Sequence, residues 1–301
     1  MDSNTIAILG LGKVGTAIGF LLRSAGYTIV AVASRSAASL NQGSIYTGGE
    51  PYTNFSEAAS RAEIIFITTS DDAIASVCEK IAAEGGITPG NIVIHMSGVG
   101  GLDLLGEARR CGAYTASIHP LQSFADVDGA IKNIPGSTFG ITTVDEIKEF
   151  TIQIVKDLGG IPFFISDTDK PLYHAAACIA SNYLTTMIHM VEVIYQSLGL
   201  NHKDAMNAFW PLVKGTLKNI KEQGSVQALT GPIARGDMGT LRKHLEVLRN
   251  KIPAFLRMYG ILGILTTELA VKKKTLSPQG AERIIKLLEG EIRYEHTNKH
   301  E

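Results

Sequence analysis

The chain has 301 residues, of which 45% are hydrophobic and 19% are charged, and its 28 Lys and Arg are balanced by 29 Asp and Glu. These proportions exclude an intrinsically disordered chain, which would need fewer apolar residues and a strong charge excess. The formal charge of -1 provides no basic field for a polyanion, so we expect no nucleic-acid partner. At roughly 150 residues per domain, the length suggests two domains.

Neither the cysteines nor the histidines indicate a metal site. Cys78, Cys111 and Cys178 are dispersed and odd in number, and the histidines show no His-Glu-x-x-His pattern. The N-terminus enters an apolar strand without the features of a signal peptide, and the apolar stretch at residues 254–271 looks too short and too interrupted for a membrane span. We therefore expect a cytoplasmic protein with no metal and no membrane association.

The first half of the chain alternates β-rich runs with helical patterns. A buried strand is predicted at residues 5–9, a helix at 12–25 and a second strand at 28–33. Further strands are predicted at residues 64–68, 92–95, 114–118, 138–141 and 162–165, and a helix at 73–83 follows Asp71 and Asp72, which are suitable N-cap residues. Such alternation is typical of a parallel sheet with helices on both faces.

Past residue 167 the pattern becomes helical, and no convincing strand follows. Helices are predicted at residues 169–198, 203–223, 239–259 and 278–292. The fold class is therefore α/β, with a parallel-sheet domain at residues 1–166 and an all-helical domain at residues 167–301.

A glycine motif joins the first predicted strand to the first predicted helix. Gly10, Gly12 and Gly15 fit the Gly-x-Gly-x-x-Gly pattern of a Rossmann dinucleotide-binding domain, in which the glycines make a tight turn, admit a pyrophosphate and allow close packing. The helix N-terminus then offers N–H groups to the diphosphate. Predicted cofactor contacts here are Gly10, Leu11, Gly12, Lys13, Val14 and Gly15.

The second strand ends without the acidic residue that usually binds the ribose of NAD. Instead it runs into Ser34, Arg35 and Ser36. The serines can form hydrogen bonds, and Arg35 can pair with a 2′-phosphate, although a solvated Arg in a polar turn fits the same sequence. We predict NADP(H) rather than NAD(H) as the cofactor.

Polar loops follow three more strands, at the edge where ligands of α/β sheets bind. Thr69, Ser70, Ser97 and Gly98 are further candidate cofactor contacts, and Ser97, His119 and Gln122 are candidate substrate contacts. For Asp71, helix capping is at least as good an interpretation as ligand contact. For His119, a structural hydrogen bond to its turn competes with a catalytic role.

In the long helical pattern, His174, Cys178 and Asn182 follow one another at intervals of four, which places them on one face of an α-helix. With Lys170 and Ser181 they could line a cleft between the domains, or they could be satisfied core groups. Later in the chain, Arg235 could hold a substrate carboxylate through paired hydrogen bonds, or it could belong to a surface turn with Asp237.

Several motifs together resemble the proteins that combine a Rossmann-like domain with the domain of unknown function 2520. The motifs are Gly10-Leu-Gly-Lys-Val-Gly15, Thr68-Thr-Ser-Asp-Asp72, His95-Met-Ser-Gly98, His119-Pro-Leu-Gln-Ser-Phe124, Tyr173-His-Ala-Ala-Ala-Cys-Ile-Ala-Ser-Asn182 and Leu229-Thr-Gly-Pro-Ile-Ala-Arg-Gly-Asp237. The resemblance implies a relation to the 6-phosphogluconate, β-hydroxyacid and pyrroline-5-carboxylate reductases, and a homodimer formed through the helical domain. Some members are alternative ketopantoate reductases.

The chain departs from the Lys-x-x-x-Asn pattern of ordinary ketopantoate reductases and β-hydroxyacid dehydrogenases. The spacing from Lys170 leads to His174, and Asn182 comes later. We therefore expect His174 to donate the proton, with Lys170 as the second candidate, because a histidine titrates near neutral pH. Asn182 and Ser181 would bind the forming alkoxide, which makes these four the candidate catalytic residues.

The expected reaction is hydride transfer from NADPH to a small 2-oxo acid, with ketopantoate as the first choice of substrate. Two alternatives remain open. The chain could reduce another small oxo acid or a cyclic imine, and an activity panel would separate these substrates. It could also be a non-catalytic NADP(H)-binding sensor, which would bind NADPH without turning over any small carbonyl compound.

Overall fold

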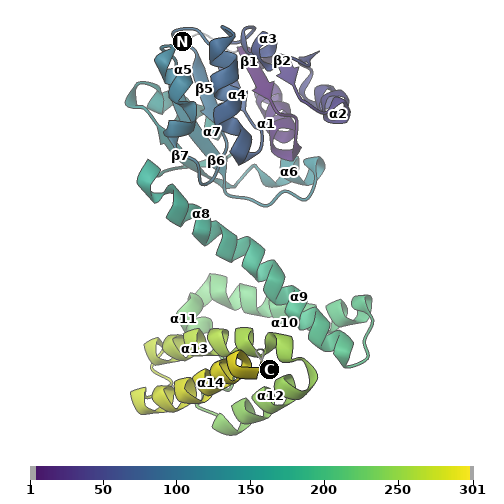
Figure 1. The fold of residues 1–301 in the computed structure, drawn as a ribbon, viewed down its shortest axis with the longest axis vertical. Helices are drawn as coiled ribbons and strands as arrows, with labels where there is room; N and C mark the ends of the chain where they lie inside the picture. Colours follow the sequence, from purple (N-terminus) through teal and green to yellow (C-terminus); the bar gives the residue numbers. More distant parts are fainter. Residues whose placement is uncertain (1–4, 299–301) are drawn as a thin grey trace. The chain divides into compact units, whose positions relative to one another are not determined.

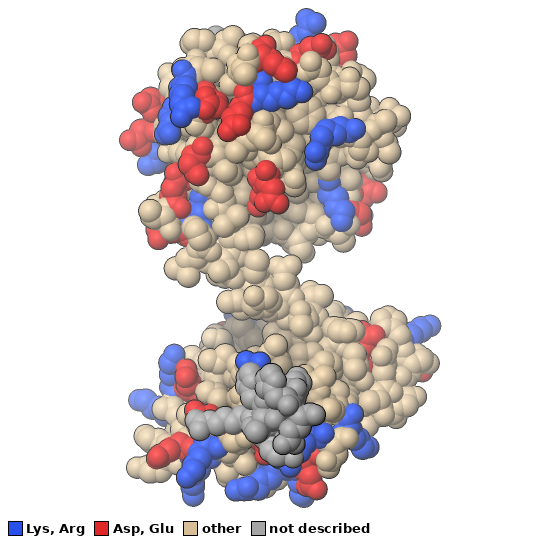
Figure 2. All heavy atoms as spheres, in the orientation of Figure 1, with Lys and Arg blue, Asp and Glu red and all other residues tan. Residues whose placement is uncertain are grey.

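The computed structural model describes residues 5–298, with the side chains beyond residue 292 left out. The chain divides into two compact units, Met1–Tyr183 and Leu184–Glu301. Lys and Arg are interspersed with Asp and Glu on the face of each unit drawn in Figure 2, in keeping with the balanced composition.

The first unit is built on an eight-stranded sheet with the order β3-β2-β1-β4-β5-β6-β7-β8 (Figure 1). The strands are β1 (Thr5–Leu9), β2 (Thr28–Ala33), β3 (Glu50–Tyr52), β4 (Ile64–Ile67), β5 (Ile92–His95), β6 (Tyr114–Pro120), β7 (Thr138–Thr143) and β8 (Ile161–Phe164). All neighbouring pairs are parallel except β6 and β7, which are antiparallel. The predicted Rossmann-type α/β fold is confirmed, and β3 is the one strand that the sequence argument missed, because its Glu-Pro-Tyr sequence lacks an apolar run.

Helices cover both faces of this sheet (Figure 1). They are α1 (Lys13–Ser24), α2 (Ala37–Thr47), α3 (Phe55–Ala59), α4 (Asp71–Ala83), α5 (Gly106–Arg110), α6 (Val127–Asn133) and α7 (Lys148–Asp157). Helix α8 (Lys170–Cys178) follows β8 and leads away from the sheet (Figure 1). The N-cap of α4 is Ser70 rather than Asp71 or Asp72, which corrects the capping prediction. The two aspartates lie in the first helical turn, where the helix dipole favours negative charge.

The strands are apolar along their whole length because both faces of the sheet are buried. In β1, Ile6 and Ile8 pack into one core with α1, α6 and α7, whereas Ala7 and Leu9 pack into the other core with α3, α4 and α5. Alternate residues of a strand point to opposite faces, so a central parallel strand must be apolar throughout.

The second unit is helical in its described residues, as predicted. Its helices are α9 (Leu184–Ser197), α10 (His202–Gln223), α11 (Ser225–Ala228), α12 (Met238–Lys251), α13 (Leu256–Lys272) and α14 (Pro278–Asn298). Leu241 and Leu245 of α12 share a core with Ala270 of α13 and Leu288 of α14. The helix predicted at residues 239–259 ends at Lys251 instead, because Pro253 cannot continue the hydrogen bonding of a helix interior.

The division between the two units comes later in the chain than the boundary expected at residues 166 and 167. Helix α8 belongs to the first unit, together with a π-helical turn at Ile179–Tyr183. The reason is that α8 hydrogen-bonds to the sheet through Lys170 and Tyr173. The sequence argument placed the boundary where strands give way to helices, and that change of pattern precedes the change of unit.

By length and composition alone, the helical stretches Asp167–Ser197 and Pro253–Lys272 are long and apolar enough to cross a membrane. The second of these contains residues 254–271, which we expected to be too short for a membrane span. That expectation is wrong as far as helix length is concerned. Core helices of soluble proteins pass the same test, and two such helices are weak evidence for a membrane. The absence of a membrane partner therefore stays a prediction.

Candidate functional site

The glycine loop between β1 and α1 has the geometry that a dinucleotide phosphate needs. Gly10 adopts a φ of +115°, which L side chains rarely adopt, and it makes the tight turn. A Cβ on Gly15 would collide with the carbonyl oxygen of Gly10, so the third glycine allows helix and strand to pack closely. A Cβ on Gly12 would meet nothing within 4 Å, so the second glycine faces open space. Each glycine thus has the role that the motif assigns to it.

The N-terminus of α1 is open to an anion. Gly12 is its N-cap, no side chain caps it, and its first turn carries no acidic residue. Its first backbone N–H groups therefore lack the intrahelical partners of later turns and lie at the positive end of the helix dipole. The side chain of Leu11 is buried beneath the loop and that of Lys13 is exposed, so the loop offers mainly its backbone to a phosphate.

Two serines shape the turn after β2. The Oγ of Ser34 accepts a hydrogen bond from the Ser36 N–H at 3.3 Å, and the Oγ of Ser36 caps α2 by accepting from the Ser39 N–H at 3.3 Å. Arg35 between them is exposed, and its guanidinium has no hydrogen bond or ion pair within residues 5–298. The turn therefore presents the guanidinium of Arg35, which has no partner among the described residues, at the end of β2 next to β1 and its glycine loop. The NADP(H) prediction requires a cation at this place.

The loop after β4 holds a polar atom without a partner. The hydroxyl of Thr69 is buried and, among the described residues, makes no hydrogen bond, a state it shares with Thr115. An unsatisfied buried hydroxyl costs about 1–3 kcal/mol, and a ligand that bonds to it would remove that cost. Ser70 follows at the N-cap of α4, where its side chain makes no capping bond. Both residues fit the predicted cofactor contacts.

A cluster of basic and aromatic side chains lies where β5, β6 and α8 meet. We call His95, His119, Lys170, Tyr173 and His174 the histidine cluster. His95 ends β5, His119 lies near the end of β6, and the other three lie on α8. In the described part of the chain no group of metal-binding side chains is found, so nothing here points to a metal centre.

Lys170 is buried at the base of this cluster, with 1% of its surface exposed. Its Nζ donates to the Ser97 carbonyl oxygen at 3.1 Å and to the Ser117 Oγ at 2.8 Å. Burial lowers the pKa of Lys170 to about 8, against the opposing effect of Asp167 and Asp71. The lysine therefore ties α8 to the ends of β5 and β6 and leaves a positive charge there at neutral pH.

His95 is fully buried, and its hydrogen bonds fix its tautomer. The Ser97 N–H donates to Nδ1 at 3.1 Å, so the proton must be on Nε2, which lies 3.0 Å from the Gly101 carbonyl oxygen. Burial, followed by the charge of Lys170, lowers the pKa of His95 to about 4. His95 is thus a neutral group that holds the loop after β5.

His119 and His174 approach Gly98 from two elements. Their rings are 6.0 Å apart between centroids at an angle of 77°. A Cβ on Gly98 would lie 2.5 Å from Cδ2 of His174 and 2.9 Å from Nε2 of His119. Glycine at this position is therefore what lets both imidazoles reach the end of β5.

Tyr173 is the third aromatic group of the cluster. Its hydroxyl lies 3.0 Å from Nδ1 of His119, and the two rings are perpendicular. Burial raises the pKa of Tyr173 to about 12, so the phenol keeps its proton. Burial, with the charges of Lys170, His174 and His95, lowers the pKa of His119 to about 4.

The other predicted site residues are more dispersed. The Ser97 Oγ accepts from the N–H groups of Val99 and Gly100. The Gln122 amide donates to the Asn133 carbonyl oxygen at the end of α6 and to the Ser137 Oγ before β7. Arg235 is exposed in the turn before α12 of the second unit.

Asn182 and Ser181 lie in the π-helical turn after α8 and both have interaction partners. A π-turn departs from the α-helical repeat, so the spacing of four no longer places Asn182 beneath Cys178. Cys178 itself lies near His174, with Sγ 3.9 Å from Nδ1, as the spacing predicts.

Sequence reasoning did not select His95, Ser117 or Tyr173. His95 and Tyr173 lie inside motifs that carry the resemblance, Tyr173 next to the selected His174 and His95 two residues before the selected Ser97. Ser117 lies in the middle of a β-rich run, and no local pattern marks it as polar and functional. Its role depends on the register in which Ser117 pairs with His95, which only the sheet reveals.

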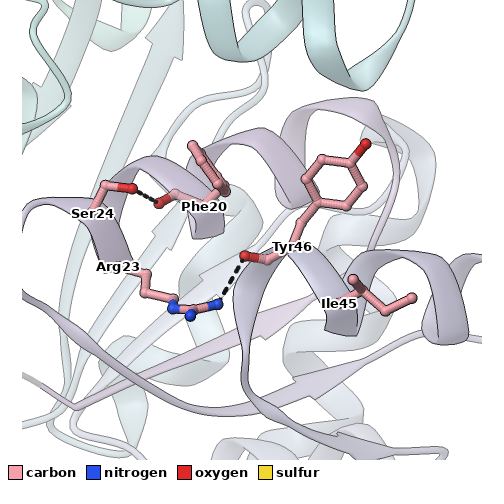
Figure 3. A pocket seen from close by; sticks show the side chains of 5 residues that line it. All are labelled: Phe20, Arg23, Ser24, Ile45 and Tyr46. Atoms are coloured by element: carbon pink, nitrogen blue, oxygen red, sulfur yellow. Dashed lines mark hydrogen bonds between the residues drawn. The ribbon is translucent and has the colours of Figure 1, made fainter.

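A shallow pocket of about 300 Å³ lies elsewhere, between α1 and α2 (Figure 3). Phe20, Arg23, Ser24, Ile45 and Tyr46 line it, and the Arg23 guanidinium donates to the Tyr46 carbonyl oxygen. Helix α1 has 12 residues, so its two ends are about 18 Å apart. The pocket is at the end of α1 opposite the glycine loop and does not belong to the same site.

Solved structures of low sequence identity share this fold. A protein described as an NADP oxidoreductase from Bacteroides fragilis is 21% identical with a TM-score of 0.74, over 88% of this chain and 98% of that one. A pyrroline-5-carboxylate reductase from Coxiella burnetii is 18% identical with a TM-score of 0.57, over 96% and 99%. A reductive aminase from Aspergillus terreus, in complex with NADPH and ethyl-5-oxohexanoate, is 17% identical with a TM-score of 0.58, over 97% and 94%.

Family models match both halves of the chain. No curated protein matches it. A Rossmann-like domain matches residues 3–120, and the domain of unknown function DUF2520 matches residues 137–266. The resemblance inferred from the motifs is confirmed: the chain carries a Rossmann-like domain followed by a DUF2520 domain.

Proposed function

We propose that the chain is an NADPH-dependent reductase of a small 2-oxo acid. The observation that carries this proposal is the alignment of the site along one edge of the sheet. Strands β1, β4, β5 and β6 are parallel neighbours, so their carboxyl ends lie at the same edge. The glycine loop, Thr69 and Gly98 follow β1, β4 and β5, and His119 lies near the carboxyl end of β6. A dinucleotide bound at the loop would therefore extend toward the histidine cluster.

NADP(H) fits the phosphate-binding end of this edge better than NAD(H). The uncommitted guanidinium of Arg35 is suited to paired hydrogen bonds with a 2′-phosphate. One structure of similar fold holds NADPH, and another is described as an NADP oxidoreductase, which supports the same choice.

The charge of the cluster favours a ketone over an iminium as the group reduced. Lys170 is cationic at neutral pH, and the cluster itself contains no carboxylate. A ketone becomes negatively charged at oxygen as it is reduced, which a nearby cation stabilises, whereas a protonated imine would be repelled. A small 2-oxo acid therefore fits better than a cyclic imine, and ketopantoate is the first candidate because some proteins with this domain pair reduce it.

The bound cofactor would supply the hydride, and the chain would orient the substrate and provide a proton. Lys170 would fix the loop after β5 and stabilise negative charge, and a histidine of the cluster would protonate the oxygen. His174 is the donor that the sequence favours. Arg235, Asn182 and Ser181 remain candidates for holding the carboxylate and the hydroxyl of the substrate.

The test is oxidation of NADPH by the purified protein with ketopantoate, a panel of other small 2-oxo acids and a cyclic imine. Controls lack substrate or contain NADH. Saturable turnover of one oxo acid with NADPH is the expected result. Turnover of the imine alone would overturn the assignment of the reacting group, and tight NADPH binding without any turnover would favour a sensor.

We further expect a cytoplasmic homodimer, formed through the helical domain. The second unit exposes large apolar side chains, among them Leu198, Leu212 and Leu265, which are 63%, 71% and 56% exposed in the single chain. Large apolar side chains that are exposed in a single chain are typical of an interface when they gather in one patch. Sedimentation at micromolar concentration should give twice the mass of the chain, and a clean monomer would refute the dimer.

A further inference from the structure

We infer that Tyr173 holds His119 in the tautomer that carries its proton on Nε2, and that this N–H group donates the proton in the reduction. The tautomer of His119 does not depend on the proposed function, whereas the donation of a proton in the reduction rests on it. The inference makes His119 the catalytic acid in place of His174, and it makes Tyr173 a positioning residue.

Three elements of the first unit build the Tyr173–His119 pair. His119 belongs to β6, Tyr173 belongs to α8, and Gly140 of β7 lies opposite His119 in the antiparallel ladder. A Cβ on Gly140 would be 2.9 Å from the Tyr173 hydroxyl oxygen, so glycine in β7 gives the phenol its place. The hydroxyl then lies 3.0 Å from Nδ1, within the range of a good hydrogen bond.

The hydroxyl must be the donor in this bond. The phenol is protonated at any pH near neutrality, and a buried tyrosine hydroxyl normally donates its proton to a partner. Within the described part of the chain, Nδ1 of His119 is the acceptor found for it. An imidazole nitrogen that accepts carries no hydrogen, so the proton of neutral His119 is on Nε2.

The two histidines present different atoms to Gly98. His119 presents Nε2, which makes no hydrogen bond to residues 5–298, whereas His174 presents the carbon Cδ2 and turns Nδ1 toward the Cys178 Sγ at 3.9 Å. A donor without a partner beside the end of β5 is suited to a substrate oxygen. The hydrogen bond from Tyr173, which assigns a proton to Nε2 of His119 and is not found for His174 among the described residues, selects His119 over His174.

The surroundings keep His119 neutral. Lys170 from α8, His174 from α8 and His95 from β5 are the titratable groups that oppose a positive charge on it, and Tyr173 is uncharged. With burial, they bring the pKa of His119 to about 4. The donor is therefore a neutral imidazole, whose availability does not decline as the pH rises through 6 or 7.

Tyr173 replaces the proton that His119 gives to the substrate. A bound NADPH would supply the hydride to the carbonyl carbon, and the electron pair of the C=O π bond would then reside on oxygen. That oxygen takes the proton from Nε2, Nδ1 takes the proton of the Tyr173 hydroxyl, and the half-buried phenolate is reprotonated from solvent. One hydride and one proton are consumed for each carbonyl reduced, and no imidazolate remains.

The first half is tested on the protein without cofactor, by nitrogen-15 NMR of histidine-labelled samples. Wild-type His119 should show a protonated Nε2 and an unprotonated Nδ1 from pH 5.5 to 8. In Tyr173→Phe this signature should become a mixture of tautomers, while Tyr183→Phe, on the same helical stretch but exposed, should leave it unchanged. A proton on Nδ1 in the wild type would overturn the inference whether or not the protein is a reductase.

The second half is tested by kinetics. His119→Asn should lower kcat by roughly a hundredfold or more with little change in NADPH affinity, as expected for loss of a general acid, whereas His174→Asn should cost less. Tyr173→Phe should lower kcat with an unchanged KM. A loss of kcat as the pH rises through about 6.5, or a His174→Asn variant that is more impaired than His119→Asn, would reject neutral His119 as the donor.

Discussion

The glycine loop and the histidine cluster differ in how their parts are distributed along the chain. All of the loop lies within residues 10–15, although Gly10 and Gly15 also lie close against Thr68 after β4. The cluster combines residues from β5, β6 and α8, separated by up to 79 positions between His95 and His174. A local motif can therefore be read from its spacing, whereas the cluster depends on strand order, on register and on where α8 packs.

The two regions also differ in what they offer a ligand. The loop offers backbone N–H groups and one helix dipole, which suit any diphosphate. The cluster offers side chains whose protonation is set by their mutual burial and by Lys170. Binding of the cofactor and chemistry on the substrate should therefore respond to different substitutions.

The largest effect is expected for Gly98→Ala. The new Cβ would lie 2.5 Å from His174 and 2.9 Å from His119, so both imidazoles must move. A displacement of about 1 Å at a reacting centre costs about a hundredfold in rate, and we expect a loss of kcat of at least that order. Gly106→Ala, where a Cβ meets nothing within 4 Å, is the control and should keep full activity. Full activity in Gly98→Ala would show that the cluster is not the catalytic centre.

The next effect separates two glycines of the loop. Gly15→Ala forces a Cβ against the Gly10 carbonyl oxygen and should destabilise the fold by about 1–3 kcal/mol, measured by urea unfolding. Gly12→Ala meets no atom of the chain, so its stability should stay close to wild type while its affinity for NADPH falls by roughly tenfold or more. Unchanged NADPH affinity in a folded Gly12→Ala protein would argue against a phosphate at this loop.

A smaller effect is expected for Arg35→Gln. Loss of a charge-assisted hydrogen bond costs about 1.5–3 kcal/mol, so affinity for NADPH should fall by roughly ten- to a hundredfold while affinity for NADH stays the same. Arg109→Gln in α5 is a matched exposed control. Isothermal titration with both cofactors measures the ratio, and a parallel loss of both affinities would remove Arg35 from the 2′-phosphate site.

The last effect concerns the free energy of unfolding in acid rather than activity or cofactor affinity. The pKa of buried His95 is about 4 in the folded protein against 6.5 normally, so the unfolded chain binds its proton first as the pH falls. The contribution of neutral His95 to the free energy of unfolding is therefore fully present above pH 6.5. It decreases by about 3 kcal/mol as the pH falls to 4. Urea unfolding of wild type and His95→Asn at pH 7 and 4.5 measures this, and exposed His189→Asn is the control. Equal pH dependence in wild type and His95→Asn would contradict a neutral buried His95.

Much of the fold was predictable from the sequence. Parallel strands buried on both faces give apolar runs such as Ile64–Ile67, which periodicity detects, and the glycine loop gives a fixed spacing. The short strand at Glu50–Tyr52 was not predictable because two of its three residues are exposed. The end of α12 before Pro253 could have been predicted, because a proline cannot continue the hydrogen bonding of a helix interior.

Several residues of the candidate site were predictable from the sequence, but the hydrogen bonds that join them were not. Lys170, His119 and His174 were all selected, but nothing in their spacing shows that Lys170 bonds to Ser117 or that Tyr173 bonds to His119. The helix-face argument for Asn182 assumed an unbroken α-helix, and the π-turn at Ile179–Tyr183 is not encoded by any simple pattern. Side-chain direction, which separates His119 from His174, appears only in three dimensions.

The central claim is that a dinucleotide at the glycine loop delivers hydride to a carbonyl compound at the histidine cluster. The most direct test uses NADPH deuterated at either face of C4, with the oxo acid that the activity panel identifies, and mass spectrometry of the product. Deuterium at the carbinol carbon from one face only, with labelled product formed more slowly in both Gly12→Ala and His119→Asn, is the predicted result. Product without label from either face, while NADPH remains tightly bound, would contradict the account.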